Sequence, residues 1–90
     1  MKLPILKLDK YTLPEQYKKI VEEYKEFRDA KKHHEHMLEG IDLLQSLMGY
    51  LLMANPDLND LQYYFEIHNE KLTSRNWETD GHIELKFHYK

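Results

Sequence analysis

Residues 37–53 are apolar around most of a helix circumference, and no other feature constrains the fold of this chain more. A helix that is hydrophobic nearly all round is normally buried. One narrow polar strip interrupts the apolar surface and consists of Glu35, Glu39, Asp42 and Ser46. Carboxylates buried without partners cost several kcal/mol each or acquire a raised pKa. The strip therefore predicts a compensating cation.

A second acidic pair, Glu23 and Glu26, lies on the preceding predicted helix. Residues three apart share a helix face, so this pair and the pair at 39 and 42 can each present two carboxylates in one direction. Taken alone, Glu23 and Glu26 could equally form surface ion pairs with Lys19 and Arg28. Two antiparallel helices, however, can bring all four carboxylates together, and oxygen ligands suit Mg²⁺, Mn²⁺ or Ca²⁺. The sequence thus predicts a divalent-metal site formed by Glu23, Glu26, Glu39 and Asp42.

Capping and turn signals divide the middle of the chain into three predicted helices. Thr12, Pro14 and Glu15 form a capping-box signature, which predicts a helix that ends near residue 30. The polar segment 31–36 is expected to join this helix to the second one, which should end near residue 53. Asn55, Pro56 and Asp57 then break the helix, and a third helix is predicted over residues 58–74.

Both ends of the chain are predicted to lie outside this helical core. Residues 1–11 contain a short apolar run and are expected to form an extended arm. Apolar and polar residues alternate over 82–90, after a turn signal at Asp80 and Gly81, which predicts a half-buried strand. We therefore expect a single all-α domain: the arm, a helical core over 12–76 and a β-like tail. A chain of 90 residues buries a modest fraction of its surface, so oligomerisation should complete the core.

The composition excludes several classes of protein. The absence of cysteine excludes disulfides and thiolate metal sites and is compatible with a cytoplasmic location. No stretch reaches membrane-spanning length, so no membrane association is expected. The formal net charge of -3, with acids and bases interspersed, argues against binding to duplex nucleic acid. Seven tyrosines, three phenylalanines and one tryptophan are a large aromatic content, which favours a pocket or a subunit interface.

A basic element follows the two acidic pairs: Lys71, Arg75 and Asn76 form Lys-x-x-x-Arg-Asn. Glu-x-x-Glu at 23–26, Glu-x-x-Asp at 39–42 and this element occur in an order that resembles the all-α nucleoside triphosphate pyrophosphohydrolases of the MazG type. The resemblance covers roughly residues 12–77. The family often has a glycine directly before the final aspartate, whereas here Gly40 lies one place earlier.

The resemblance implies an activity and a role for each residue of the pattern. The activity is hydrolysis of a (deoxy)nucleoside triphosphate to its monophosphate and pyrophosphate, with Mg²⁺ as cofactor and Mn²⁺ as a substitute. The four carboxylates would hold the metal, and one of them or Glu22 would position the attacking water. Lys71 and Arg75 would contact phosphate oxygens, and Asn76 would add a hydrogen bond. Tyr50, Tyr63, Tyr64 or Trp77 could stack on the base. Similar proteins work as homodimers or homotetramers, and nucleotide-pool house-cleaning is the corresponding cellular role.

Two alternatives stay open at this point. The first is a non-catalytic helical module of the same fold that serves oligomerisation or partner binding. The second rests on the cluster of His33, His34, Glu35 and His36, in which His33 and His36 are three apart and could share a Zn²⁺ or Ni²⁺ ion. In that case metal binding should be lost when both histidines become alanine and should survive Glu39→Ala.

Overall fold

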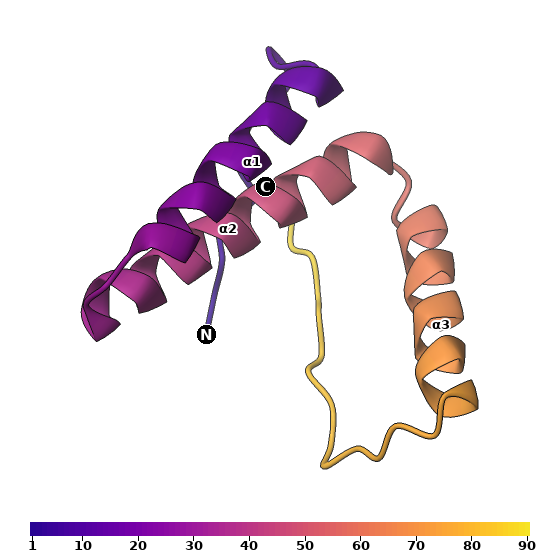
Figure 1. Ribbon diagram of the computed structural model, residues 1–90. Coiled ribbons are helices and arrows are strands. Elements are labelled where there is room, and N and C mark those ends of the chain that lie inside the picture. Colours follow the sequence, from indigo (N-terminus) through magenta and orange to yellow (C-terminus); the bar gives the residue numbers. More distant parts are fainter. The chain divides into compact units, whose positions relative to one another are not determined.

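A computed structural model describes residues 1–90 and contains three helices: α1 (Leu13–Asp29), α2 (His33–Ala54) and α3 (Leu58–Ser74) (Figure 1). No strand is present, so the all-α prediction is confirmed. The chain divides into two compact units, Met1–Pro56 with α1 and α2, and Asp57–Lys90 with α3. None of the three helices combines the length and the hydropathy needed to cross a membrane.

α1 begins at the predicted capping box. The Thr12 hydroxyl accepts a hydrogen bond from the backbone N–H of Glu15, at 3.3 Å, and the Glu15 carboxylate accepts one from the backbone N–H of Thr12, at 3.2 Å. Pro14 lies in the first turn, where its missing N–H leaves no intrahelical bond unmade. At the other end, the N–H of Ala30 donates to the carbonyl of Glu26 and the chain then becomes extended.

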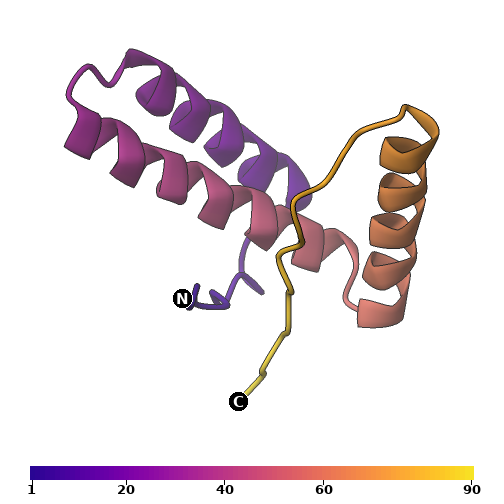
Figure 2. The same ribbon diagram turned by 90° about the horizontal axis from the view of Figure 1, so that it is seen from below.

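α2 packs against α1 and runs antiparallel to it, as both ribbon views show (Figures 1 and 2). The join between them is shorter than the predicted segment 31–36, because α2 already begins at His33. The ring of His36 stacks on the ring of Phe27, with centroids 4.2 Å apart, and its Nδ1 lies 3.0 Å from the Phe27 carbonyl oxygen. This contact gives a carbonyl in the last turn of α1 a hydrogen-bond partner and thereby favours an early start of α2.

The seam between the two helices, where their side chains face one another, is polar. Gln16, Glu23 and Ser46 are buried there, and Gln16 Nε2 donates to the Ser46 carbonyl oxygen at 3.0 Å. The only buried large apolar side chain in the whole chain is that of Leu61 on α3. The unit Met1–Pro56 is therefore a helical hairpin whose buried side chains are polar.

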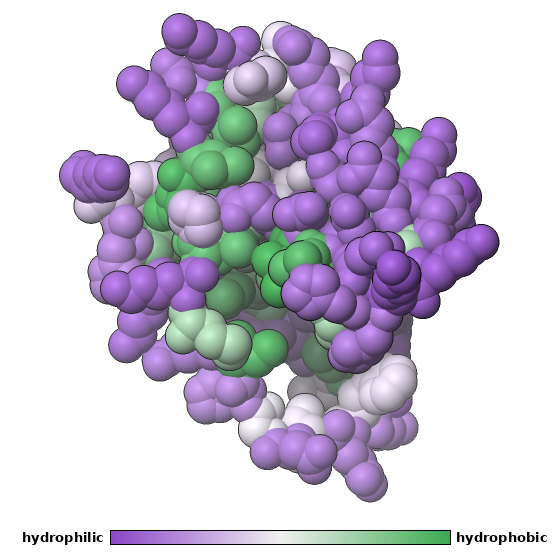
Figure 3. Space-filling view, turned by 90° about the vertical axis from the view of Figure 1, so that its left-hand side faces the viewer, coloured by the Kyte–Doolittle hydropathy of each residue, from purple (hydrophilic) through white to green (hydrophobic).

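The apolar side chains of the hairpin lie mostly on its outside. We call the exposed ones on the two helices the outer apolar surface; they are Leu13, Tyr17, Val21 and Tyr24 on α1 and Met37, Leu38, Ile41, Leu44, Leu47 and Leu51 on α2. Figure 3 shows apolar side chains, in green, that reach the molecular surface among polar ones. The sequence predicted that α2 is buried nearly all round, but a single neighbouring helix covers only one of its faces. Its remaining apolar residues therefore stay exposed in this chain.

The N-terminal arm contains no helix and is held against α2. Gln45 Nε2 donates to the Pro4 carbonyl oxygen at 2.8 Å. Leu8 lies against Gly49, where an added Cβ would come within 2.8 Å of Leu8 Cδ1. Because Gly49 has no side chain, Leu8 can lie directly against the backbone of α2.

α3 has the bounds that the sequence predicted. Asp57 caps its N-terminus. At the C-terminus, the N–H of Trp77 donates to the Leu72 carbonyl at 3.1 Å and that of Asn76 donates to the Thr73 carbonyl at 3.0 Å. Asn76 has a φ of 60°, the left-handed conformation that this type of helix end requires and that asparagine tolerates.

The strand predicted over 82–90 does not form, and that prediction is wrong for this chain. The segment has no regular secondary structure, and its residues take no part in backbone–backbone hydrogen bonds. A strand is stabilised by its ladder with a neighbouring strand and by cross-strand side-chain pairs. Alternation of apolar and polar residues gives the segment one apolar face, but it does not provide the neighbouring strand with which the segment would form hydrogen bonds.

Candidate metal centre

Three carboxylates come together across the seam: Glu23 and Glu26 from α1, and Glu39 from α2. One oxygen from each lies within 4.8 Å of the others. Antiparallel packing produces this arrangement, because the second half of α1 lies beside the first half of α2 (Figure 1). The structure thus brings together three of the four predicted metal ligands.

Two oxygens of this group are buried and have no partner. Glu23 is only 6% exposed, and neither its Oε2 nor the Oε2 of Glu39 accepts a hydrogen bond. A buried charged oxygen without a partner costs far more free energy than one in water. A bound cation would supply the missing partner, and an all-oxygen donor set suits a hard divalent ion such as Mg²⁺ or Mn²⁺. The three carboxylates could therefore hold such an ion.

One cation of the chain pairs with this group. Lys19 Nζ lies 2.8 Å from Glu23 Oε1, one helical turn away. The hydrogen bond to Glu23 raises the pKa of the Lys19 ammonium, and the Glu23 charge raises it further. Because the Lys19 side chain is 53% exposed, solvent screens this pair and its contribution to stability is small. The i, i+4 spacing was the sequence signal for this ion pair.

The carboxylates repel one another. The charge of Glu23, followed by that of Glu39, raises the pKa of the Glu26 carboxyl above its ordinary value. Glu26 is itself exposed, so neighbouring negative charge is a larger cause of the shift than burial. This is the behaviour expected of carboxylates that lie close to one another.

Replacing Glu26 with glutamine should raise the melting temperature of the EDTA-treated protein at neutral pH. A carboxyl whose pKa is raised in the folded state loses its proton more readily in the unfolded state. Its negative charge therefore destabilises the fold at neutral pH. That penalty disappears as the pH falls through the folded pKa toward the ordinary value of 4.5. Melting curves followed by circular dichroism should show a difference between variant and wild type that shrinks on acidification. A difference that grows on acidification would contradict this account.

Asp42 and Glu22 lie outside the group of three. Asp42, the fourth predicted ligand, is exposed. Successive residues of an α-helix are separated by about 100°, so the side chain three places after Glu39 leaves the helix about 60° further round. The role of Asp42 as a ligand stays a prediction. Glu22 is exposed and lines a cavity beside the seam.

The predicted substrate contacts lie in the second compact unit, Asp57–Lys90. Lys71, Arg75, Asn76 and Trp77 are all exposed at the end of α3. Lys71 and Arg75 are one turn apart, where cations also complement the helix dipole. Asn76 has a structural task in ending the helix. The roles of these four residues toward a substrate stay predictions.

No group of three potential metal ligands forms at the histidine cluster. His33 and His34 are exposed, while His36 contacts Phe27 through its ring and its Nδ1. The only group of three potential ligands in the structure contains no histidine. The Zn²⁺ or Ni²⁺ alternative therefore has no assembled site in this structure.

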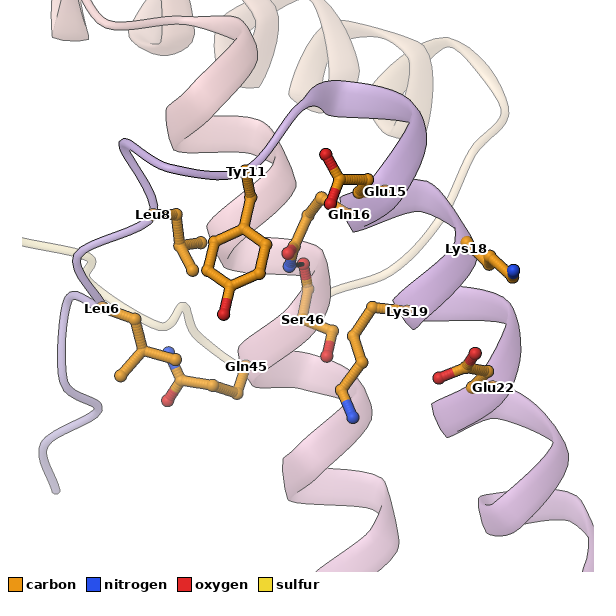
Figure 4. A pocket seen from close by; sticks show the side chains of 10 residues that line it. All are labelled: Leu6, Leu8, Tyr11, Glu15, Gln16, Lys18, Lys19, Glu22, Gln45 and Ser46. Atoms are coloured by element: carbon orange, nitrogen blue, oxygen red, sulfur yellow. Dashed lines mark hydrogen bonds between the residues drawn. The ribbon is translucent and has the colours of Figure 1, made fainter.

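A cavity of about 530 Å³ lies between the arm, α1 and α2 (Figure 4). Leu6 and Tyr11 of the arm, Lys19 and Glu22 of α1, and Ser46 of α2 are among the residues that line it. Its volume falls in the range of small-molecule sites. The sequence did not predict this cavity, because the arm carries no periodic pattern that would indicate where it packs.

Comparison with known proteins identified no relative. No protein-family model matches the chain, and neither a curated protein nor a solved structure matches it. The assignment of a function therefore depends on the residues and the geometry of the chain itself.

Proposed function

We propose that the protein is a Mg²⁺-dependent nucleoside triphosphate pyrophosphohydrolase of the MazG type, and that Mn²⁺ can replace Mg²⁺. The observation that carries this proposal is the group of three carboxylates in which Glu23 Oε2 and Glu39 Oε2 are buried without partners. A cluster of acids on a solvated surface needs no ion, because water satisfies its oxygens. A cluster with buried oxygens at a helix–helix seam gains a large stabilisation from one.

The chemistry divides between the metal and the residues around it. Bound Mg²⁺ would neutralise the triphosphate and make a water molecule more acidic. Glu23, Glu26 and Glu39 would hold the ion, and Asp42 would join them. As the water oxygen bonds to the α-phosphorus, a carboxylate takes up its proton, and the bond to the oxygen that bridges the α- and β-phosphates breaks. Glu22 suits this task, because it lines the cavity beside the seam.

Substrate binding completes the proposal. Lys71 and Arg75 would neutralise phosphate oxygens, with the planar guanidinium of Arg75 suited to a bidentate contact. Asn76 would donate a hydrogen bond, and Trp77 would stack on the base. The products are a nucleoside monophosphate and pyrophosphate, which fits a role in clearing unwanted nucleotides from the pool.

The outer apolar surface supports a homo-oligomer. Its side chains form stripes on both helices, with Met37, Ile41 and Leu44 at the i, i+4, i+7 spacing of one helix face. Contiguous exposed apolar surface of this kind marks an interface. A second hairpin against it would give a four-helix arrangement with an apolar core. We therefore propose a homodimer, or a homotetramer built from such pairs.

The outer apolar surface also supports a second candidate function. A helical module that only oligomerises or binds a partner would need the same surface. It would have no need for the buried carboxylates at the seam, which favours the enzyme over the module.

Incubation with a panel of ribo- and deoxyribonucleoside triphosphates and Mg²⁺ should release pyrophosphate and a monophosphate. Addition of EDTA should stop the release, because the carboxylates would lose their cation. Products can be resolved by phosphorus NMR, which distinguishes pyrophosphate from orthophosphate. Orthophosphate would reject the proposed bond cleavage. A folded protein that is silent across the panel would favour the non-catalytic module.

A further inference from the structure

Lys19 belongs both to the carboxylate group and to the neighbouring cavity. Its ammonium contacts Glu23 Oε1 at 2.8 Å, and its side chain forms part of the cavity lining. Figure 4 shows Lys19 extending from α1 into the space beside α2, whereas Lys18 points away from that space. Lys19 is therefore placed to contact either the carboxylate group or a ligand in the cavity.

The two oxygens of the Glu23 carboxylate have different surroundings. Oε1 accepts the Lys19 ammonium, while Oε2 is buried without a partner. A divalent ion held by Glu23, Glu26 and Glu39 would take over the neutralisation of this carboxylate and would repel the ammonium. The lysine side chain is half exposed and has a flexible four-carbon stem, so its head can turn away without unpacking the helix.

We propose that Lys19 is a mobile cation that pairs with Glu23 before a metal ion binds and contacts a phosphate oxygen of the substrate, in the cavity, once the ion is bound. The phosphate half of this inference rests on the proposed function. The cavity offers the space, and a triphosphate that bridges the ion and the cavity would pass the ammonium. Lys19 then has opposite effects on the two ligands, because it competes with the metal ion and attracts the phosphate.

Lys19→Met tests this directly, because methionine keeps the length and the helix propensity of the side chain. Mn²⁺ alone is titrated into the wild type and the variant, with free Mn²⁺ measured by electron paramagnetic resonance. A triphosphate analogue with a non-hydrolysable α,β-imido link is then titrated at saturating Mn²⁺. We expect Mn²⁺ to bind about threefold to tenfold more tightly to the variant, through loss of a partly screened like charge. We expect the analogue to bind about tenfold more weakly, through loss of a charge-assisted hydrogen bond.

Two further variants serve as controls. Lys19→Arg keeps the charge and should remain close to the wild type in both titrations. Lys25 is exposed, lies on the same helix and forms no ion pair, so Lys25→Met removes a positive charge without breaking a contact. It should change either affinity by less than about twofold, as expected for a screened surface charge.

Opposite shifts in the two affinities of Lys19→Met support the inference. Parallel weakening of both would show that Lys19 only holds Glu23 in place, and unchanged affinities would show that it is a bystander; either result overturns the inference. Both titrations are independent of catalysis. Tight Mn²⁺ binding with the expected shifts, but without pyrophosphate release, would reject the proposed reaction and keep the role of Lys19. Absence of Mn²⁺ binding to the wild type would reject both.

Discussion

Glu23→Gln should weaken Mn²⁺ binding by more than about 100-fold and abolish pyrophosphate release, since a lost ligand should cost at least as much as a lost outer-shell partner of a ligand. The amide keeps the shape of the carboxylate but removes its charge, and it brings an N–H donor to a place where a cation needs an acceptor. Glu23 is the most buried member of the group, so no solvent-exposed group can easily replace it. Its loss also removes the largest cause of the raised pKa of Glu26.

Isothermal titration with Mn²⁺, together with the pyrophosphate assay, measures this effect. Glu35→Gln is the matched control, because Glu35 is an exposed carboxylate in the same polar strip of α2 and lies outside the group of three. It should leave Mn²⁺ binding unchanged. Equal losses in both variants would mean that the ion is held by diffuse negative charge. A large fall in the melting temperature of Glu23→Gln, measured in EDTA, would instead assign Glu23 a structural role.

The second large effect concerns the outer apolar surface, where Leu44→Lys should convert the proposed oligomer to a monomer. Leu44 is 50% exposed in the single chain and lies between Ile41 and Leu51 along the stripe on α2. In an assembled four-helix arrangement this position would be buried, and an unpaired ammonium there would cost several kcal/mol. In the isolated hairpin the same lysine would remain in water, so the variant should keep its helices.

Sedimentation velocity over a range of protein concentrations measures this change, with circular dichroism to follow helix content. Lys25→Glu alters the charge of an exposed polar position on α1 and should leave the mass of the sedimenting oligomer unchanged. A wild type that sediments as a monomer at every concentration would reject the proposed interface. The interface would also be rejected if Leu44→Lys sedimented like an oligomeric wild type.

The helices could be predicted from the sequence because their boundaries depend on local chemistry. The capping box of Thr12 and Glu15 sets the start of α1, and Asp57 sets the start of α3. α2 begins earlier than the sequence predicts. No side chain caps its first turn, and the contact of His36 with Phe27 favours that turn instead. That contact joins residues on different helices, and no spacing rule reveals it.

The candidate site was predictable in part for the same reason. The i, i+3 rule identifies residues that share a helix face, and it singled out four carboxylates: Glu23, Glu26, Glu39 and Asp42. It does not fix the rotation of α2 against α1, which decides that Glu39 lies at the seam while Asp42 is exposed. The strand at 82–90 and the cavity beside the arm depend on partners distant in sequence, and periodicity carries no information about those.

Gly40 of α2 has a consequence for the size of ion that the proposed site would accept. Gly40 follows Glu39 directly, and an added Cβ there would come within 3.0 Å of the Phe27 ring on α1. A side chain at this position would require the Phe27 ring, or α1 with it, to shift by a few tenths of an ångström beside the site. Mg²⁺ requires oxygens at about 2.0–2.1 Å in strict octahedral geometry, whereas Ca²⁺ accepts about 2.3–2.6 Å and irregular shells. Selectivity for Mg²⁺ over Ca²⁺ would then depend on the absence of a side chain at Gly40, although Gly40 is not itself a ligand.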